Sequence, residues 1–259
     1  NILLLFSPKN TPYWIRHTMT RLYVPCPLSL NTEIELPEEA AHHFIKVLRA
    51  RVGEAVCLFN GEGGEYHGVL SRADKRNAYV TLNQFIANDK TSPLKVHLGQ
   101  VLSRGERMDF AIQKATELGV TEITPLFSER CEVRLGGDDR QDKKLAHWQR
   151  VAISACEQCG LNRVPIIHPP QSLETWTQNT TAELRFVLAP SLEGFPSASA
   201  KPQSVAVLIG SEGGLTEREI NHAQQQGFLS WCLGQRVLRT ETAPIAVLSV
   251  LHWLWGDFQ

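Results

Sequence analysis

Short apolar runs alternate with amphipathic segments along the chain from residue 94 onward. Leu94–Leu102, Val120–Leu126 and Leu184–Leu188 are short and mainly apolar, as expected of strands. Between them, Glu106–Leu118 and Lys143–Gln158 carry apolar residues at every third or fourth position, which is the spacing of amphipathic helices. Strands that alternate with helices predict a mainly parallel sheet, so the predicted fold class is α/β.

The last quarter of the chain contains two apolar runs that each lead into a glycine-bearing loop. Val205–Ile209 precedes the loop Gly210–Gly214, and Phe228–Leu233 precedes the loop Gly234–Thr240. In open α/β sheets, ligands bind in the loops that leave the carboxyl ends of strands. We therefore expect these two loops to share one pocket.

A helix is predicted after each loop. Thr216 and Glu219 form a capping box, which is a start signal for the first helix. The second helix is expected to begin near Thr242, which is a suitable N-cap residue. Pro244 supports this start, because proline is favoured in the first turn of a helix. The run that follows, Ile245–Trp255, is apolar on most sides. This helix is expected to be buried, either within its own domain or against a second subunit.

Before residue 88 the pattern is one of short strands and turns. The dipeptide Asn60-Gly61 lies between two apolar runs and predicts a hairpin. One helix is predicted from Pro37. Its apolar positions are Ala40, Ala41, Phe44, Val47 and Leu48. The polar stretch 88–93 interrupts both periodicities, so a domain boundary is placed there. Farther along the chain, the glycine- and charge-rich segment Leu135–Asp142 is predicted to be a mobile loop.

Composition narrows the possible functions. The formal net charge of −1 is unlike the basic balance of most nucleic-acid-binding domains, although a local basic patch is compatible with it. No apolar run approaches the roughly 20 residues that a membrane helix needs. The six scattered cysteines are expected to be reduced thiols in a cytoplasmic protein. Cys156 and Cys159 form a C-x-x-C, but no second pair stands at zinc-finger spacing, so no metal is expected.

The loop Gly210–Gly214 matches neither common phosphate-binding motif. A P-loop needs Lys and then Ser or Thr after its last glycine, and Leu215 stands there instead. The dinucleotide motif needs glycine at its third position, where this chain has Glu212, whose carboxylate would repel a pyrophosphate. Two interpretations stay open: a tight turn with no other role, or a loop whose backbone approaches a ligand closely.

Two segments of the last quarter carry a family resemblance, and they read IGSEGGLTEREI (209–220) and LGQRVLRTETAP (233–244). They resemble the carboxyl-terminal half of the knotted SPOUT-class RNA methyltransferases. The most similar family is the bacterial one that methylates N3 of a uridine in small-subunit ribosomal RNA. The segments KATELGV (114–120) and ITPLFSER (123–130) are also similar to that family. The family usually has Pro where this chain has Ser211, and Pro-Arg-Ile or similar at Gln235–Val237.

The resemblance begins at Met19 and implies a fold and a domain division. The implied fold is a SPOUT-type knotted, mainly parallel sheet with helices on both faces, preceded by a small PUA-like β-barrel. The barrel would be an RNA-binding domain at 19–90, and the methyltransferase domain, with a carboxyl-terminal trefoil knot, would occupy 91–259. Periodicity cannot show a knot, so the knot is expected on the resemblance alone. Residues 1–18 are expected to be an extension outside the fold.

The resemblance also implies S-adenosylmethionine (SAM), held in a bent form by three loops. The sulfonium of SAM is cationic, which suits an acidic loop that contains Glu212. The implied cofactor-binding residues are Leu188, Ala189, Pro190, Ile209, Gly210, Ser211, Glu212, Gly213, Gly214, Leu233, Gly234, Val237, Leu238, Thr240 and Ala243.

The implied reaction is methyl transfer to N3 of uracil, which is a weak acid and, when neutral, a poor nucleophile. A group must therefore remove the N3 proton or stabilise the forming anion. Arg239 is the candidate stabilising group, and Glu241 or Glu117 is the candidate base or orienting group, with a structural ion pair as the alternative for each. Two other functions stay open: methyl transfer to a ribose 2′-hydroxyl or another base of rRNA or tRNA, and non-catalytic RNA binding or assembly.

The implied partner is 16S rRNA within the assembled 30S subunit, and the implied assembly state is a homodimer. N3 lies on the Watson–Crick edge, so the target base must be unpaired or flipped out. For any one basic residue, solvated surface charge is the alternative to an RNA contact. The candidate RNA-binding residues are Arg21, Arg49, Arg51, Arg104, Arg107, Lys114, Arg130 and Arg163.

Overall fold

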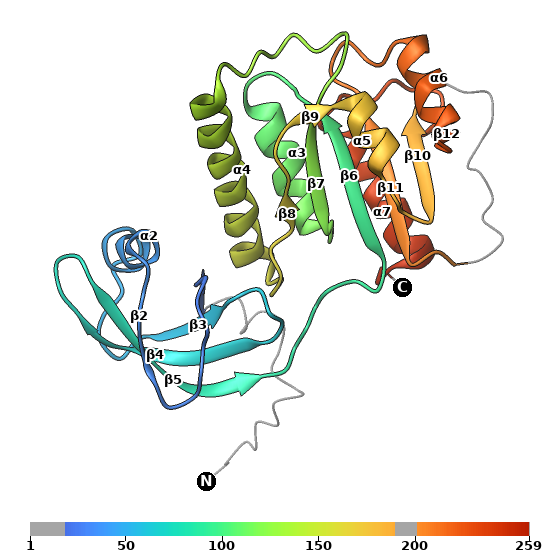
Figure 1. The fold of residues 1–259 in the computed structure, drawn as a ribbon. Coiled ribbons are helices and arrows are strands. Elements are labelled where there is room, and N and C mark those ends of the chain that lie inside the picture. Colours follow the sequence, from blue (N-terminus) through green and yellow to red (C-terminus); the bar gives the residue numbers. More distant parts are fainter. Residues whose placement is uncertain (1–18, 190–200, 259) are drawn as a thin grey trace. The chain divides into compact units, whose positions relative to one another are not determined.

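The structure is a computed structural model that describes residues 19–189 and 201–258 (Figure 1). The chain divides into two compact units, and the division falls between Lys90 and Thr91. Each unit has its own hydrophobic core. The predicted extension 1–18 and the predicted cofactor residue Pro190 lie outside the described residues. No helix in the described ranges is long and apolar enough to cross a membrane.

The smaller unit is built on a five-stranded sheet of order β1-β3-β4-β5-β2. Its strands are β1 (Thr20–Tyr23), β2 (Glu33–Glu35), β3 (Ala55–Phe59), β4 (Glu65–Ala73) and β5 (Ala78–Ile86). β1 is parallel to β3, and the other neighbours are antiparallel. The hairpin predicted at Asn60-Gly61 is present between β3 and β4, although residues 60–64 make a longer loop than a two-residue turn.

The helix predicted from Pro37 is less regular than expected. α2 covers Glu38–His42 and continues as one π-helical turn, η2, over His43–Val47. Phe44 is fully buried, whereas Val47 is 58% exposed and Leu48 is 44% exposed. A π turn rotates less per residue than an α turn, so the positions after Phe44 leave the buried face. The prediction that Val47 and Leu48 continue the apolar face of a helix was therefore wrong.

The larger unit contains a seven-stranded parallel sheet with helices on both faces (Figure 1). Its strand order is β12-β10-β11-β6-β7-β8, and β9 also pairs with β7. The strands are β6 (Lys95–Val101), β7 (Glu122–Phe127), β8 (Ile166–Ile167), β9 (Gln171–Ser172), β10 (Leu184–Leu188), β11 (Ser204–Ile209) and β12 (Leu229–Trp231). The helices are α3 (Glu106–Glu117), α4 (Asp138–Cys159), α5 (Leu173–Asn179), α6 (Glu217–Gln225) and α7 (Ala243–Trp255).

The central strands β6 and β11 place the functional loops. Leu98 on β6 and Val207 and Leu208 on β11 are fully buried, as expected for parallel strands covered on both faces. Because all the strands are parallel, the loops after β10, β11 and β12 leave the same edge of the sheet. The α/β prediction is confirmed. The trefoil knot stays a prediction, because the connection from β10 to β11 includes residues 190–200, outside the described ranges.

Two predicted boundaries need correction. Leu135–Asp142 was predicted to be a loop, but α4 begins at Asp138. Asp138 and Asp139 lie in its first turn, where acidic side chains favour the positive end of the helix dipole. Thr242 does precede α7, but its side chain makes no capping hydrogen bond. The reason is that Thr242 already has helical φ and ψ values, which are unlike those of a capping residue.

Candidate cofactor and catalytic site

A cleft of about 900 Å³ opens at the carboxyl edge of the larger sheet. Its walls include the last residues of three strands, Leu188, Ile209 and Trp231, together with the loops that follow β11 and β12. The two glycine-bearing loops therefore share one pocket, as the strand pattern predicts. Cavities of this size are typical of sites for cofactor-sized molecules.

Most of the implied cofactor residues line this cleft. Gly213 does not: a Cβ at this position would lie 3.1 Å from the carbonyl oxygen of Arg130, so Gly213 faces the loop after β7. The implied residues that line the cleft are Leu188, Ala189, Ile209, Gly210, Ser211, Glu212, Gly214, Leu233, Gly234, Val237, Leu238, Thr240 and Ala243.

The first loop is held by a backbone turn and by the helix after it. The amide of Gly214 donates to the carbonyl of Ser211 at 2.9 Å, and Gly214 has a φ of +68°, a value that favours glycine. The predicted capping box between Thr216 and Glu219 is present. Glu219 Oε1 also accepts from the amide of Glu129 at 2.8 Å, which fixes α6 to the loop after β7. The sequence thus specifies both the turn and its anchor.

Thr240 joins the second loop to the first. Its hydroxyl donates to the carbonyl of Gly210 at 2.8 Å and accepts from the side-chain amide of Gln100 at 3.0 Å. Ser103 lies 3.2 Å from the same hydroxyl. Thr240 is buried and holds the two loops together. Gln100 and Ser103 were missed by the sequence analysis, because Gln100 lies in β6, Ser103 follows it, and neither belongs to the two motifs.

Charged side chains form one rim of the cleft. Arg107 donates to Glu212 Oε1 at 2.7 Å, and the backbone amide of Arg104 donates to the same oxygen at 3.1 Å. Burial acts to raise the pKa of Glu212, but these hydrogen bonds outweigh burial and the pKa is lowered. Arg107 also lies 3.9 Å from Glu241 Oε1. Two carboxylates thus share one guanidinium, and this rim can face a cationic group.

The structure separates the two candidate bases. Glu241 lines the cleft, and its Oε2 is buried with no hydrogen-bond partner among the described residues. Glu117 is not among the lining residues; it accepts hydrogen bonds from Lys114 at 2.7 and 2.9 Å. Arg239 also lines the cleft and is exposed. Glu241 and Arg239 therefore meet at one site, and Glu117 does not join them.

Six further lining residues were not predicted individually. They occupy the strand end or the motif positions between the predicted ones, so their place in the sequence was the available signal. They are Leu215, Ile220, Trp231, Cys232, Gln235 and Arg236.

The candidate RNA-binding residues differ in their surroundings. Arg21 is not a surface cation, because its side chain is only 11% exposed and donates to Glu65 at 2.6 Å. Arg49, Arg51 and Arg163 are exposed.

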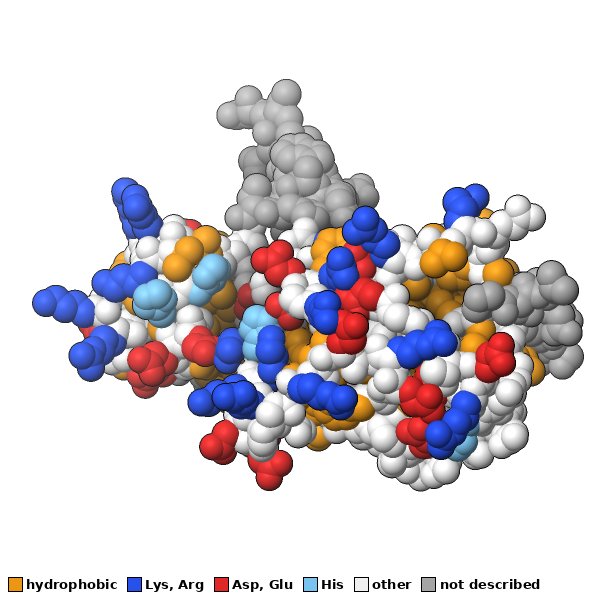
Figure 2. Space-filling model, turned by 90° about the horizontal axis from the view of Figure 1, so that it is seen from above, with side chains coloured by type: hydrophobic (Ala, Val, Ile, Leu, Met, Phe, Trp, Pro, Cys, Tyr) orange, Lys and Arg blue, Asp and Glu red, His pale blue; other side chains and the backbone are white. Residues whose placement is uncertain are grey.

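Three of the remaining candidates lie at the carboxyl edge of the larger sheet. Arg107 and Arg130 line the cleft, and Arg104 forms an ion pair with Glu132. Lys114 pairs with Glu117. Figure 2 looks onto this edge and shows lysine and arginine side chains interspersed with acidic ones. Basic side chains therefore lie beside the cleft although the formal net charge of the whole protein is −1.

Comparison with protein families places the two units in one class. Residues 90–252 match the model of an RNA methyltransferase domain, and residues 36–83 match that of an RNA methyltransferase PUA domain. The fold and the cleft are thus those of an RNA methyltransferase with an amino-terminal PUA domain.

Individual relatives narrow the class. Ribosomal RNA small subunit methyltransferase E of Buchnera aphidicola subsp. Schizaphis graminum is 36% identical, over 94% of this chain and 99% of the relative. A solved structure of the protein of that name from Neisseria gonorrhoeae, bound to S-adenosyl methionine, is 37% identical. It has a TM-score of 0.87 and covers 93% of this chain and 100% of the other. A methyltransferase of Legionella pneumophila, solved with its bound cofactor SAM, is 39% identical with a TM-score of 0.90, covering 93% and 99% of the two chains. The chain belongs to the family of ribosomal RNA small subunit methyltransferase E.

Proposed function

We propose that the chain transfers a methyl group from SAM to N3 of a uridine in 16S ribosomal RNA. The observation that carries this proposal is the single cleft made by the two glycine-bearing loops, with Glu241 and Arg239 on its wall. Relatives that cover nearly the whole chain were solved with SAM, which supports the choice of cofactor.

The residues present fit SAM. A Cβ at Gly214 or Gly234 would meet no atom of the described residues within 4 Å, so the backbone there borders space that a ligand can occupy. The apolar wall made by Leu188, Ile209 and Leu233 suits an adenine ring, and the acidic rim suits a sulfonium. When bound, SAM supplies an electrophilic methyl group, whose bond to sulfur breaks as N3 forms its bond to carbon.

Glu241 is the proposed base. Its Oε2 is a buried acceptor without a partner in the described residues, so it can accept the proton that N3 of uracil must lose. Arg107 lies 3.9 Å from the other oxygen and holds the carboxylate in place. Arg239, at the exposed side of the cleft, would stabilise the negative charge that develops on the uracil oxygens.

The substrate is proposed to be the 16S rRNA of the assembled 30S subunit, with the target base flipped out of any stack. The exposed Arg49, Arg51 and Arg163 would contact phosphates, which position RNA without reading its sequence.

A homodimer is proposed from the surface of α7. This helix buries Val247, Leu248 and Leu251, but Val250 is 37% exposed and Leu254 is 38% exposed. An apolar helix face that is open in one chain is suited to cover the same face of a second copy. Light scattering at micromolar concentration tests this, and a monomer would contradict it.

The central test combines calorimetry with product mapping. SAM is titrated into the protein, which is then incubated with 30S subunits or with free 16S rRNA, and the methylated nucleoside is located by mass spectrometry. We expect saturable SAM binding and a methyl group on a uracil base. A methyl group on ribose would favour the 2′-hydroxyl alternative. The absence of SAM binding would favour a non-catalytic RNA-binding protein.

A further inference from the structure

A second polar pocket, of about 320 Å³, lies at the opposite edge of the larger sheet. Lys95, Glu122 and Ser204, the first residues of β6, β7 and β11, line it, so it lies at the amino ends of the strands. Ligand sites of parallel sheets are expected at the carboxyl ends, where the SAM cleft lies. Side chains in this pocket therefore need an explanation other than the proposed methyl transfer.

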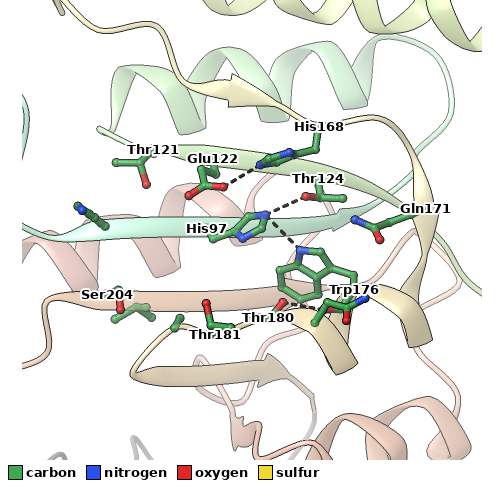
Figure 3. Close-up of a pocket in the computed structure, with 14 residues that line it drawn as sticks. His97, Thr121, Glu122, Thr124, His168, Gln171, Trp176, Thr180, Thr181 and Ser204 are labelled. Carbon is green, nitrogen blue, oxygen red and sulfur yellow. Dashed lines mark hydrogen bonds and ion pairs between the residues drawn. The ribbon is translucent and has the colours of Figure 1, made fainter.

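Strand register brings two histidines and a carboxylate together in this pocket. His97 on β6 is the direct neighbour of Glu122 on β7. Ile166 on β8 is the neighbour of Glu122 on its other side, and His168 follows two residues later, so its side chain leaves the same face. One potential ligand atom from each of His97, Glu122 and His168 lies within 4.8 Å of the others. Figure 3 shows the three side chains pointing toward one another.

The surrounding residues orient this cluster. His168 Nε2 lies 2.7 Å from Glu122 Oε2. The indole N–H of Trp176 donates to His97 Nε2 at 3.1 Å, and Thr124 Oγ1 lies 2.8 Å from the same nitrogen. An indole can only donate, so Nε2 of His97 is unprotonated and its imidazole is neutral, the form that binds metals. Gly99 makes room for the indole, since a Cβ there would lie 2.6 Å from the Trp176 ring.

A similar cluster in the smaller unit shows what this one lacks. Cys57, Glu65 and His67 also have potential ligand atoms within 4.8 Å of one another. There, however, the guanidinium of Arg21 lies 2.6 Å from Glu65 and 3.2 Å from Cys57, so a cation already occupies the position of a metal. Among the described residues, neither an arginine nor a lysine forms an ion pair with Glu122, which pairs with His168 instead. The cluster in the smaller unit is therefore neutralised by an arginine, whereas the cluster around Glu122 can accept a metal cation.

We propose that His97, Glu122 and His168 form a site for a divalent transition-metal ion, with zinc as the best fit. Two imidazoles and one carboxylate are a ligand set that zinc accepts, and three protein ligands leave a position for water or a small ligand from the pocket. In a tetrahedral zinc site the ligand atoms are roughly 3.4 Å apart, so small side-chain rotations suffice. Zinc would replace the proton between His168 and Glu122. This proposal departs from the sequence-based expectation that the protein binds no metal.

If the metal binds Nδ1 of His97, the hydrogen bonds at Nε2 of the same ring must change. The ring must then carry its proton on Nε2, where Thr124 Oγ1 can accept it, and the Trp176 N–H can no longer donate to that nitrogen. Hydrogen bonds of this kind orient metal-bound histidines. Metal binding is therefore expected to release the Trp176 indole from its acceptor, which changes its fluorescence.

Metal titration of the full chain tests the proposal. The chain is stripped with a chelator and titrated with Co²⁺, followed by absorption and by competition with Zn²⁺. We expect one saturable equivalent and no sulfur-to-cobalt charge-transfer band. His168→Asn and Glu122→Gln should each weaken affinity at least about tenfold, and Thr124→Val about tenfold. The Trp176→Phe variant should bind the metal but lose the fluorescence change.

The matched control is His147→Asn. His147 also pairs with a carboxylate, Asp109, at 2.7 Å, and its side chain is 40% exposed against 33% for His168, but no second histidine of the described ranges joins it. This variant should bind Co²⁺ like the wild type. Unsaturable binding, a thiolate band, or unchanged affinity in folded His168→Asn and Glu122→Gln would overturn the proposal. SAM affinity should be unchanged in all of these variants, so the outcome is independent of the proposed methyl transfer.

Discussion

The two edges of the larger sheet carry pockets that are built in different ways. At the carboxyl edge, contiguous loops supply the walls, and backbone groups and glycines shape the space. At the amino edge, single side chains from β6, β7, the segment after β8, and α5 converge on one point. Short sequence motifs can predict a pocket of the first kind, because its lining residues are contiguous in the chain. A pocket of the second kind depends on strand register, which no local motif records.

The largest expected effect concerns the carboxyl edge. Glu241→Gln removes the proposed base while keeping the shape of the side chain. We expect kcat for methyl transfer to fall about 100-fold or more, with little change in SAM affinity. Glu117→Gln is the matched control and should keep wild-type activity, since Glu117 does not line the cleft. Equal losses in both variants would remove Glu241 from its proposed role.

Gly234→Val should weaken SAM binding without unfolding the protein. Gly234 has a φ of +86°. A non-glycine residue with this φ is strained by about 1–2 kcal/mol, which corresponds to roughly 5- to 30-fold in affinity if the loop must keep this shape to bind. Gly53→Val is the control, because Gly53 has a φ of +90° and equally open surroundings, but lies in the smaller unit. Calorimetry with SAM compares the two, and equal affinities would place the cofactor elsewhere.

Thr240→Val tests the joint between the two loops. The substitution leaves the Gly210 carbonyl and the Gln100 amide without this partner in a buried place. We expect a loss of about 1–3 kcal/mol in the free energy of unfolding, measured by urea denaturation.

At the amino edge, His168→Asn removes the partly exposed pair with Glu122. In metal-free protein this should lower the free energy of unfolding by less than about 1 kcal/mol. The opposite ranking would show that the amino edge carries the stability.

The smallest effect is a pH dependence at the rim of the cleft. The folded pKa of Glu212 is lowered, so its contribution to stability is present above its unfolded pKa and is lost as pH falls through the folded value. In Arg107→Met the pKa of Glu212 should move upward, because its main hydrogen-bond donor is gone. Carbon-detected NMR titration of the Glu212 carboxyl measures this shift, and an unchanged pKa would contradict the assigned cause.

The bounds of the helices and strands show which parts of the fold can be predicted from the local sequence pattern. The strand Leu184–Leu188 was predicted with its observed bounds, and the capping box at Thr216 was predicted correctly, because both depend on adjacent residues. The π turn after His42 was not predicted, because the spacing of the apolar residues in this segment is that of an α-helix. The early start of α4 was missed because charged residues were read as a loop.

The candidate site divides in the same way. The glycine loops, Glu212, Arg239 and Glu241 were identified from the sequence as parts of one pocket. The sequence left Glu117 as an equal candidate to Glu241, and only the fold separates them, by engaging Glu117 with Lys114. Arg21 illustrates the converse, since nothing in its sequence context distinguishes a buried arginine from an exposed one.

By itself, the sequence determined the α/β class, the two loops and their likeness to RNA methyltransferases, because glycines, caps and apolar periodicity act over a few residues. The tertiary structure alone decided which carboxylate faces the cleft, which arginine is buried, and which histidines meet at the amino edge. These outcomes depend on residues far apart in the chain, such as His97 and His168, that become neighbours only when the strands pair.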